Sequence, residues 1–390
     1  MHPPFSVERR RARLGRRHHL AAQGDDPVAV AGDLVGLHGT DPATVYLAAA
    51  ARTEGVSAQD IEHALYERRA LARVLGMRRT VFTLPLELLG VVYGACTDTI
   101  AARERRNIVK HLTLTGMTGD VDAWLAGVEA ETLATLEARG EATGGELSDA
   151  VEGLRFEVFL NTGKPWDKPT RITTRVLSLL AAEGHIVRGR PTGGLTSSRY
   201  RWAPLRGWLP EGIARPKAAE ARAELIRRWL ATYGPGTLDD VQWWTGLTKT
   251  QVRAALQTLG AVEVELGGDT GWVLPDDLDE DDLTESWAAL LPALDPTAMG
   301  WKERGWYLGP HEAPLFDRTG NIGPTVWWGG RIVGGWAQRD DGAVVVRLLE
   351  DVGAEAEARI EERRAALQGW LGDVRVTPRF RTPLERELVA

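Results

Sequence analysis

Cysteine is almost absent from this sequence, which has 390 residues and a single Cys96. One cysteine cannot form an internal disulfide, and no spacing of Cys and His resembles a zinc site, so we expect neither a metal nor a cofactor. Long apolar runs are also missing: no run of apolar residues is long enough to form a membrane-spanning helix. The basic segment 9–17 is not followed by the hydrophobic stretch of a secretory signal. We therefore expect a cytoplasmic protein that makes no contact with membranes.

The sequence also lacks the motifs of the common enzyme classes. It contains no phosphate-binding P-loop, no dinucleotide fingerprint followed by a suitable acidic residue, no G-x-S-x-G nucleophile elbow and no H-E-x-x-H zinc motif. Any catalytic activity must therefore come from a sparser site.

Lysine is scarce, so nearly all of the positive charge is carried by arginine. The net charge of −7 argues against a protein that binds polyanions through its overall charge. The charges are segregated, however. Acidic residues gather in 276–285, whereas the basic clusters are 9–17, 103–106, 171–201 and 375–386. Because guanidinium groups make bidentate contacts with phosphate, these clusters are candidate contacts with nucleic acid.

A helix, a short turn, a second helix and a glycine-tipped hairpin are predicted twice, at Thr170–Trp202 and at Ala218–Val273. In the first copy, apolar residues recur at helical spacing from Ile172 to Leu180, and the turn Pro191–Gly194 separates two predicted strands. This order is typical of winged-helix domains. Such domains often bind duplex DNA, but some serve contacts between proteins.

The rest of the chain divides into further predicted segments. Before residue 115 we expect a divergent winged helix, with helices at 7–23, 27–38, 42–52 and 58–68 and a strand at 80–84. Linkers are predicted at 204–216 and 276–285. The last region is rich in Trp, Gly and Val, which indicates β-structure, and it ends in a helix at 354–371 and a basic tail. The predicted fold class is α+β, mainly helical, with domains at 1–115, 116–210, 217–287 and 288–390.

The most unusual local feature is a short polar segment in which His38, Thr40 and Asp41 surround Gly39. We expect Gly39 to end one helix in the left-handed conformation, and Thr40 or Asp41 to cap the next helix with Pro42 in its first turn. Such a corner can be purely structural. Alternatively, its imidazole, hydroxyl and carboxylate project from one rigid turn, where they could hold a water molecule.

Several segments resemble the AlkZ and YcaQ type of bacterial alkylpurine DNA glycosylases. The resemblance extends over nearly the whole chain and is carried by segments 36–42, 77–80, 198–202, 291–296 and 316–328. It implies tandem winged helices with an added β-rich part, arranged as a C-shaped body around DNA. Members of the family excise N7-alkylated purines, and some unhook interstrand crosslinks or confer self-resistance to a genotoxic natural product.

The family's catalytic motif is Gln, an apolar residue, and then Gln or Asp, and its positions correspond to His38, Gly39 and Thr40. All three residues depart from the motif. A neutral His38 can act as a general base, which Gln cannot, whereas Thr40 offers only a hydroxyl. We expect His38 to take a proton from a water that Thr40 or Asp41 orients, with a rate that rises through the imidazole titration near pH 6 to 7. No lysine lies at this corner, so a monofunctional hydrolase is expected.

The expected partner is double-stranded DNA that contains an alkylated purine, bound by a nucleoid-associated monomer. The candidate DNA contacts are Arg78, Arg79, Arg171, Thr173, Arg175, Arg190, Ser198, Arg199, Arg318 and Asn321. A second hypothesis is a non-catalytic winged-helix DNA-binding protein, either a lesion sensor or a transcription regulator. The two hypotheses differ in whether His38 and Thr40 face the DNA-binding concavity or pack inside the corner.

Overall fold

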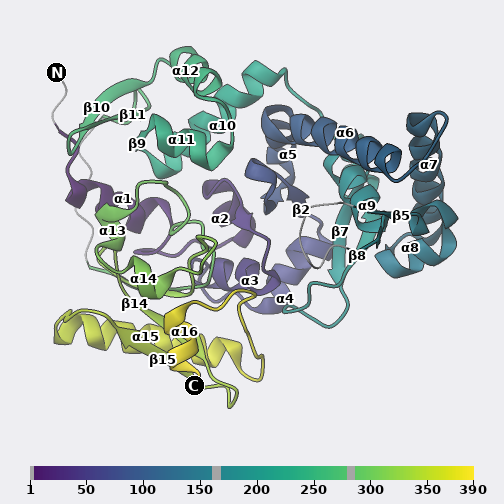
Figure 1. Cartoon of the computed structure of the whole chain (residues 1–390). Helices are drawn as coiled ribbons and strands as arrows, with labels where there is room; N and C mark the ends of the chain where they lie inside the picture. The colour runs from purple at the N-terminus through teal and green to yellow at the C-terminus, as the bar shows by residue number, and fades with distance from the viewer. Residues whose placement is uncertain (1–3, 160–167, 279–285) are drawn as a thin grey trace.

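One order of elements recurs three times along the chain: a helix, a short strand, two helices and a two-stranded hairpin (Figure 1). The computed structural model describes residues 4–159, 168–278 and 286–390, so most of the linker predicted at 276–285 lies outside the described residues. We name the three segments the first unit (27–85), the second unit (121–204) and the third unit (218–273). Their order of elements is that of a winged helix, and the domain boundaries given above remain predictions.

The elements of the three units have the following bounds. The first unit contains α2 (Pro27–Asp33), β1 (Leu37–His38), α3 (Pro42–Ala50), α4 (Ala58–Glu62, continued by a π-helical turn at His63–Glu67), β2 (Leu71–Leu75) and β3 (Val81–Pro85). The second contains α7 (Val121–Arg139), β4 (Ala142–Thr143), α8 (Gly144–Ala150), α9 (Thr173–Ala182), β7 (Ile186–Pro191) and β8 (Tyr200–Pro204). The third contains α10 (Ala218–Tyr233), β9 (Gly236–Thr237), α11 (Leu238–Thr245), α12 (Lys249–Thr258), β10 (Val262–Leu266) and β11 (Asp269–Val273).

The first two units share one six-stranded sheet, in the order β1-β3-β2-β7-β8-β4. Arg73 of β2 pairs with Arg188 of β7, which joins the hairpins of the two units edge to edge. The third unit has its own sheet, in the order β10-β11-β9. In every unit the short first strand pairs with the last strand of the hairpin, so the strands of the three units pair in the same way.

Capping boxes fix where several of the helices begin. The side chains of Thr143, Thr237 and Thr248 each accept a hydrogen bond from the backbone N–H of the third residue of the following helix, and the side-chain oxygen of that residue accepts one from the threonine N–H. These reciprocal bonds satisfy backbone N–H groups that a helix start leaves without partners. The helix starts at Leu238 and Lys249 agree with the sequence prediction for the second copy of the pattern.

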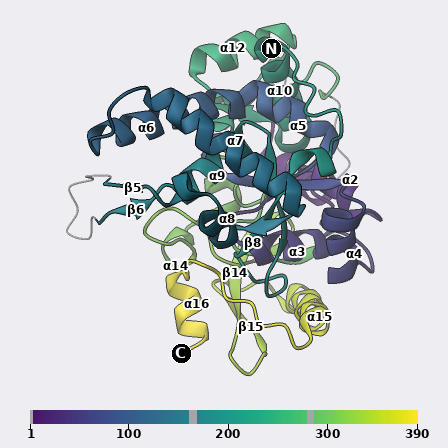
Figure 2. The same cartoon turned by 90° about the vertical axis from the view of Figure 1, so that its right-hand side faces the viewer.

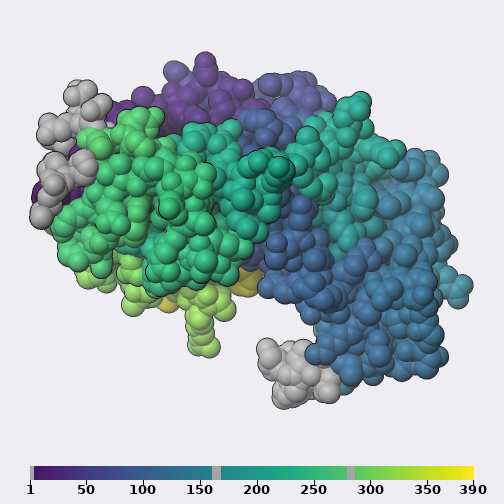
Figure 3. Space-filling model, turned by 90° about the horizontal axis from the view of Figure 1, so that it is seen from above, coloured from purple at the N-terminus to yellow at the C-terminus, as the bar shows by residue number. Residues whose placement is uncertain are grey.

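The remaining elements lie outside the three units, except β5 and β6, which are inserted between α8 and α9 of the second unit. They are α1 (Val7–Arg17), α5 (Leu86–Val92), α6 (Asp98–Leu114), β5 (Glu157–Val158) and β6 (Thr170–Arg171), followed by β12 (Ala288–Leu291), α13 (Gly305–Leu308), α14 (Glu312–Leu315), β13 (Thr325–Trp328), β14 (Arg331–Gln338), β15 (Val344–Leu348), α15 (Ala354–Leu371) and α16 (Pro383–Leu388). The last four strands form a sheet in the order β12-β13-β14-β15, and α15 packs against it. The fold is therefore α+β and mainly helical, as predicted. Seen from above, a notch separates the blue second unit from the yellow-green projection of the C-terminal region (Figure 3).

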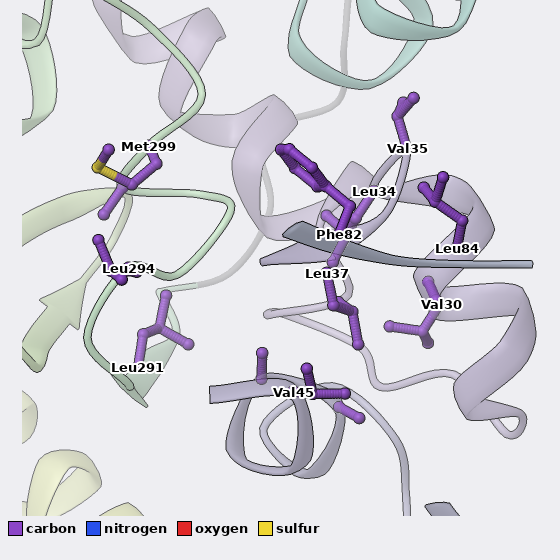
Figure 4. Packing of buried hydrophobic residues seen from close by; sticks show 14 of the residues in the cluster. Val30, Leu34, Val35, Leu37, Val45, Phe82, Leu84, Leu291, Leu294 and Met299 are labelled. Carbon is purple, nitrogen blue, oxygen red and sulfur yellow. The ribbon is translucent and has the colours of Figure 1, made fainter. Parts of the chain in front are cut away.

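The largest hydrophobic cluster lies where the first unit meets the C-terminal sheet. Leu37 and Phe82 lie on the paired strands β1 and β3, while Leu291 and Leu294 approach from the C-terminal region (Figure 4). A separate cluster combines residues of α6, α7 and α9, so α6 packs with the second unit although it follows the first along the chain.

A fully buried ion pair fastens the first unit to the C-terminal region. Arg52, just after α3, donates two hydrogen bonds to the carboxylate of Asp295, at 2.6 and 2.9 Å, and a third to the hydroxyl of Thr297. Neither member of the ion pair is accessible to solvent. Asp295 belongs to the segment 291–296 that carried part of the family resemblance, and its contacts give that segment a structural role.

Several sequence predictions of element boundaries are wrong. The helices expected at 7–23 and 27–38 end at Arg17 and Asp33, and strand β2 was not predicted. The segment 204–216 is not a free linker, because Trp208 is 9% exposed and its indole donates to the carbonyls of Leu65 and Leu71.

None of the helices in the described part of the chain has the length and apolar character that a membrane span requires. The same part of the chain contains no group of three or more His, Cys, Asp and Glu that could hold a metal.

Candidate active site

The segment around His38 is a strand and a reversal, not the predicted meeting of two helix ends. After α2 the chain turns at Val35 and Gly36, whose φ angles are +54° and +104°, and then enters β1. His38 pairs with Phe82 of β3, and the N–H of Gly39 donates to the carbonyl of Val81 at 2.7 Å. Gly36, and not Gly39, therefore takes the positive φ, because the chain must reverse before it can join β3.

Asp41 caps helix α3, in agreement with one of the two predicted caps. Its Oδ1 accepts the N–H of Ala43 at 3.1 Å, and Pro42 occupies the first turn. Its Oδ2 accepts the backbone N–H of Arg379 at 3.0 Å, and the residue is 6% exposed. Both carboxylate oxygens are therefore engaged in holding two parts of the chain together.

His38 is largely buried, with 7% of the residue exposed. Its ring lies 5.7 Å from that of Phe82, and its Nδ1 has no hydrogen-bonding partner among the described residues. Burial, and secondarily the positive charge of Arg78, lowers the pKa of His38 to about 4. The imidazole is therefore neutral at physiological pH, and its pKa lies below the expected titration near pH 6 to 7 because the ring is buried.

Thr40 lines an open cleft of about 570 Å³ at the junction of the first unit, the second unit and the C-terminal segment. The cleft is lined by Gly39, Thr40, Val81, Thr143, Gly144, Gly145, Arg188, Thr192, Ser198, Arg199, Tyr200, Trp202 and Arg379. This lining includes the end of β1, the start of α8 and the hairpin of β7 and β8. It contains three guanidinium groups and no carboxylate, so the cleft is strongly positive even though the chain is acidic overall.

The three arginines of the cleft are free to bind an anion. In the part of the chain that the structure describes, no carboxylate lies within ion-pair distance of Arg188, Arg199 or Arg379. Arg199 and Arg379 are exposed, whereas Arg188 is half-buried against the rings of Tyr200 and Trp202, at 5.9 and 5.4 Å. Burial lowers the pKa of Arg188, but a guanidinium stays protonated at any physiological pH.

A buried arginine holds the aromatic wall of the cleft in place. Arg73 is 2% exposed and donates from Nη1 to the hydroxyl of Tyr200. Its guanidinium also lies 5.1 Å from the centre of the Tyr200 ring and 5.8 Å from that of Tyr46 on α3. Because Arg73 comes from the first unit and Tyr200 from the second, this contact fixes the two sides of the cleft relative to one another.

Of the predicted DNA contacts, only Ser198 and Arg199 line the cleft together with Thr40. Three others have their side chains engaged within the protein. Arg190 forms ion pairs with Glu62 and Glu67, the hydroxyl of Thr173 donates to the Leu154 carbonyl, and the amide of Asn321 donates to Asp317.

The remaining predicted contacts lie outside the cleft. Arg78 and Arg79 form the tip of the β2–β3 hairpin with φ angles of +54° and +62°, which are strained for residues with a side chain. Arg78 stacks on Trp243 of the third unit at 3.8 Å, and Arg79 pairs with Glu104 at 3.0 Å. Arg171, Arg175 and Arg318 lie on β6, on α9 and at an exposed turn after α14.

Four charged or aromatic residues of the cleft were not predicted as site residues: Arg188, Tyr200, Trp202 and Arg379. Three of them belong to the basic hairpin of the second unit, where the alternation of cationic and aromatic residues was a usable signal. Arg379 lies in the basic tail, and nothing in the sequence near it indicates that the tail returns to α3.

Comparisons with known proteins identify the family of this chain. A search of curated proteins finds no match. Among solved structures, the chain is similar to the Streptomyces sahachiroi DNA glycosylase AlkZ, with a TM-score of 0.72 and 19% sequence identity over 95% of this chain and 98% of the other. The family described as DNA glycosylase AlkZ-like matches residues 31–370, which confirms the resemblance seen in the sequence. The chain therefore belongs to the AlkZ-like DNA glycosylase family.

Proposed function

We propose that this protein is a monofunctional DNA glycosylase that hydrolyses the N-glycosidic bond of N7-alkylated purines in duplex DNA. The observation that carries the proposal is the position of Thr40. In a member of a DNA glycosylase family, the last residue of the catalytic motif lines a cleft that presents three arginines without carboxylate partners. Such a cleft can hold the phosphates on either side of a damaged nucleotide.

The reaction needs only a modest catalyst. An N7-alkylated purine carries a positive charge, so its glycosidic bond is already weakened and the leaving base needs no protonation. We assign to the Thr40 hydroxyl the orientation of the attacking water, and to the neutral imidazole of His38 the acceptance of its proton. A pKa of about 4 makes His38 about as basic as an ordinary aspartate, which is one of the residues found in the family's motif.

Asp41 has a positioning role in this proposal. Its carboxylate holds the start of α3 through Ala43 and the C-terminal segment through Arg379, directly after Thr40 in the chain. It also provides negative charge next to the motif, where positive charge develops on the sugar in the transition state.

The direct test is incubation of the protein with duplexes that carry N7-methylguanine or a nitrogen-mustard crosslink. We expect abasic sites, detected by alkaline cleavage, to accumulate faster than spontaneous depurination with at least one of the two substrates. Tight binding without base release on both would support the alternative, a lesion sensor on a glycosylase scaffold.

We predict that the rate of base release is nearly independent of pH between about 5.5 and 9. Only the neutral imidazole accepts a proton, and a pKa of about 4 keeps His38 neutral throughout that range. The rate should fall only as the pH approaches 4. Single-turnover rates on N7-methylguanine DNA, corrected for spontaneous depurination, test this. A tenfold rise between pH 5.5 and 7.5 would show instead that an imidazole with an ordinary pKa carries the reaction.

We also predict that Arg188→Gln combined with Arg199→Gln weakens duplex binding and flattens its salt dependence. Each lost phosphate contact lowers the slope of log affinity against log salt by about 0.9. The matched control is Arg190→Gln in the same hairpin, because Glu62 and Glu67 already neutralise Arg190. Affinity measured between about 50 and 200 mM salt separates the variants. Equal slopes for the wild type and the double variant would remove these two arginines from the DNA contact.

A further inference from the structure

The C-terminal segment 372–382 returns from the end of α15 to the cleft. It lies beyond residues 31–370, to which the family similarity extends. The yellow segment passes beside α3 in Figure 1 and below β8 in Figure 2. The backbone contact of Arg379 with Asp41, together with the position of Arg379 in the cleft lining, brings this segment to the catalytic motif.

The segment is anchored on both sides of Arg379. On one side, the N–H of Val376 donates to the side chain of Gln338 at 2.8 Å, and Val376 is buried. On the other side, Thr382 and Glu385 form the capping box of α16, and both are nearly inaccessible to solvent. A loop fixed at both ends and in the middle can hold its outward side chains in a defined position.

Two large side chains project from this anchored loop into solvent. Arg379 is exposed, and its guanidinium lies 5.4 Å from the centre of the Phe380 ring. Phe380 is 44% exposed, whereas nearly all other large apolar residues of the described chain are buried or half-buried. The ring of Phe380 is therefore presented to solvent on the same loop that brings Arg379 to the positive cleft.

We propose that Phe380 is a wedge that enters the duplex next to the damaged nucleotide, while Arg379 binds the adjacent phosphate. The inference rests on the proposed function only in taking duplex DNA as the substrate. Apolar side chains inserted between base pairs unstack them and bend the duplex, and a neighbouring arginine provides the electrostatic contact. Aromatic stacking on a base has the appropriate chemistry, because every base presents a π-face.

The wedge can be tested without base release. The probe is a duplex with a tetrahydrofuran abasic analogue, which the protein cannot cleave, and 2-aminopurine as the neighbouring base. We expect wild-type protein to raise the 2-aminopurine fluorescence by unstacking that base. Phe380→Ala should lose most of this increase and bind about tenfold more weakly, whereas Phe380→Trp should retain both. Arg379→Ala should lower the salt slope by about one unit and leave its backbone bond to Asp41 in place.

Two control variants isolate the effect. Leu114→Ala removes another exposed apolar side chain, 69% exposed on α6, and Arg359→Ala removes an exposed arginine from α15. Both should behave as wild type. Because Phe380 is exposed, Phe380→Ala should also unfold at the same temperature as the wild type.

The wedge proposal would be overturned if Phe380→Ala and the wild type had the same fluorescence increase and the same affinity. A protein that releases no base from any substrate would overturn the proposed function while leaving this measurement valid.

Discussion

Substitution of His38 by alanine is expected to slow base release by about a hundredfold while leaving duplex affinity nearly unchanged. Loss of a positioned proton acceptor typically costs about two to four orders of magnitude in rate. His38 is largely buried beside the cleft-lining Gly39 and Thr40 and presents no charge to phosphate, so its removal should spare binding. Thr40→Ala should cost less, because a neighbouring water can replace a hydroxyl that only orients the nucleophile. Single-turnover excision of N7-methylguanine and duplex affinity are the two measurements.

The control for this prediction is His38→Gln, which restores the residue found at this position in the family's motif. It should release the base faster than His38→Ala, because an amide can orient the water, and more slowly than the wild type, because an amide cannot accept the proton. Equal excision by the wild type and His38→Ala would remove the imidazole from the reaction. Asp41 would then be the next residue to examine.

Asp295→Ala is expected to lower the free energy of unfolding by about 3–5 kcal/mol. The substitution leaves the guanidinium of Arg52 buried without its charge partner, and breaking a buried pair from one side has a cost of this size. The pair also joins the first unit to the C-terminal region, so its loss should loosen the cleft. Chemical denaturation followed by circular dichroism measures the effect.

The surface pair of Arg359 and Glu362 provides the comparison for Asp295→Ala. Both side chains are more than half exposed, at 61% and 65%. Glu362→Ala should therefore change the free energy of unfolding by less than about 1 kcal/mol. If Asp295→Ala has an equally small effect, the ion pair does not hold the two regions together.

The local elements of the fold were largely predictable from the sequence. The helical spacing of apolar residues predicted α9 and α10, and capping residues such as Thr237 and Thr248 predicted the starts of α11 and α12. The glycine-tipped hairpin β10–β11 also lies where it was predicted. These features depend on residues close together in the chain, for which propensity and hydrogen bonding decide the structure.

The features that bring the site residues together depend on pairing between strands that are far apart in the sequence. The two-residue strand β1 exists because it pairs with β3, and so a helix was predicted in its place. The join of β2 to β7 brings Arg73 and Arg188 together, and only the tertiary structure sets that register. Likewise, the depressed pKa of His38 follows from burial against Phe82 and the proximity of Arg78, neither of which the isolated segment reveals.

The most direct test of the central claim compares the wild type with the double variant His38→Gln plus Thr40→Gln. Both are mixed in excess with duplex DNA containing N7-methylguanine, and the released base is quantified in a single turnover. The account predicts that both proteins release the base well above the spontaneous rate, because the cleft and its arginines are shared and each motif can orient water. A wild-type protein that binds this DNA but releases no base, while the double variant does release it, would contradict the account and identify a lesion sensor.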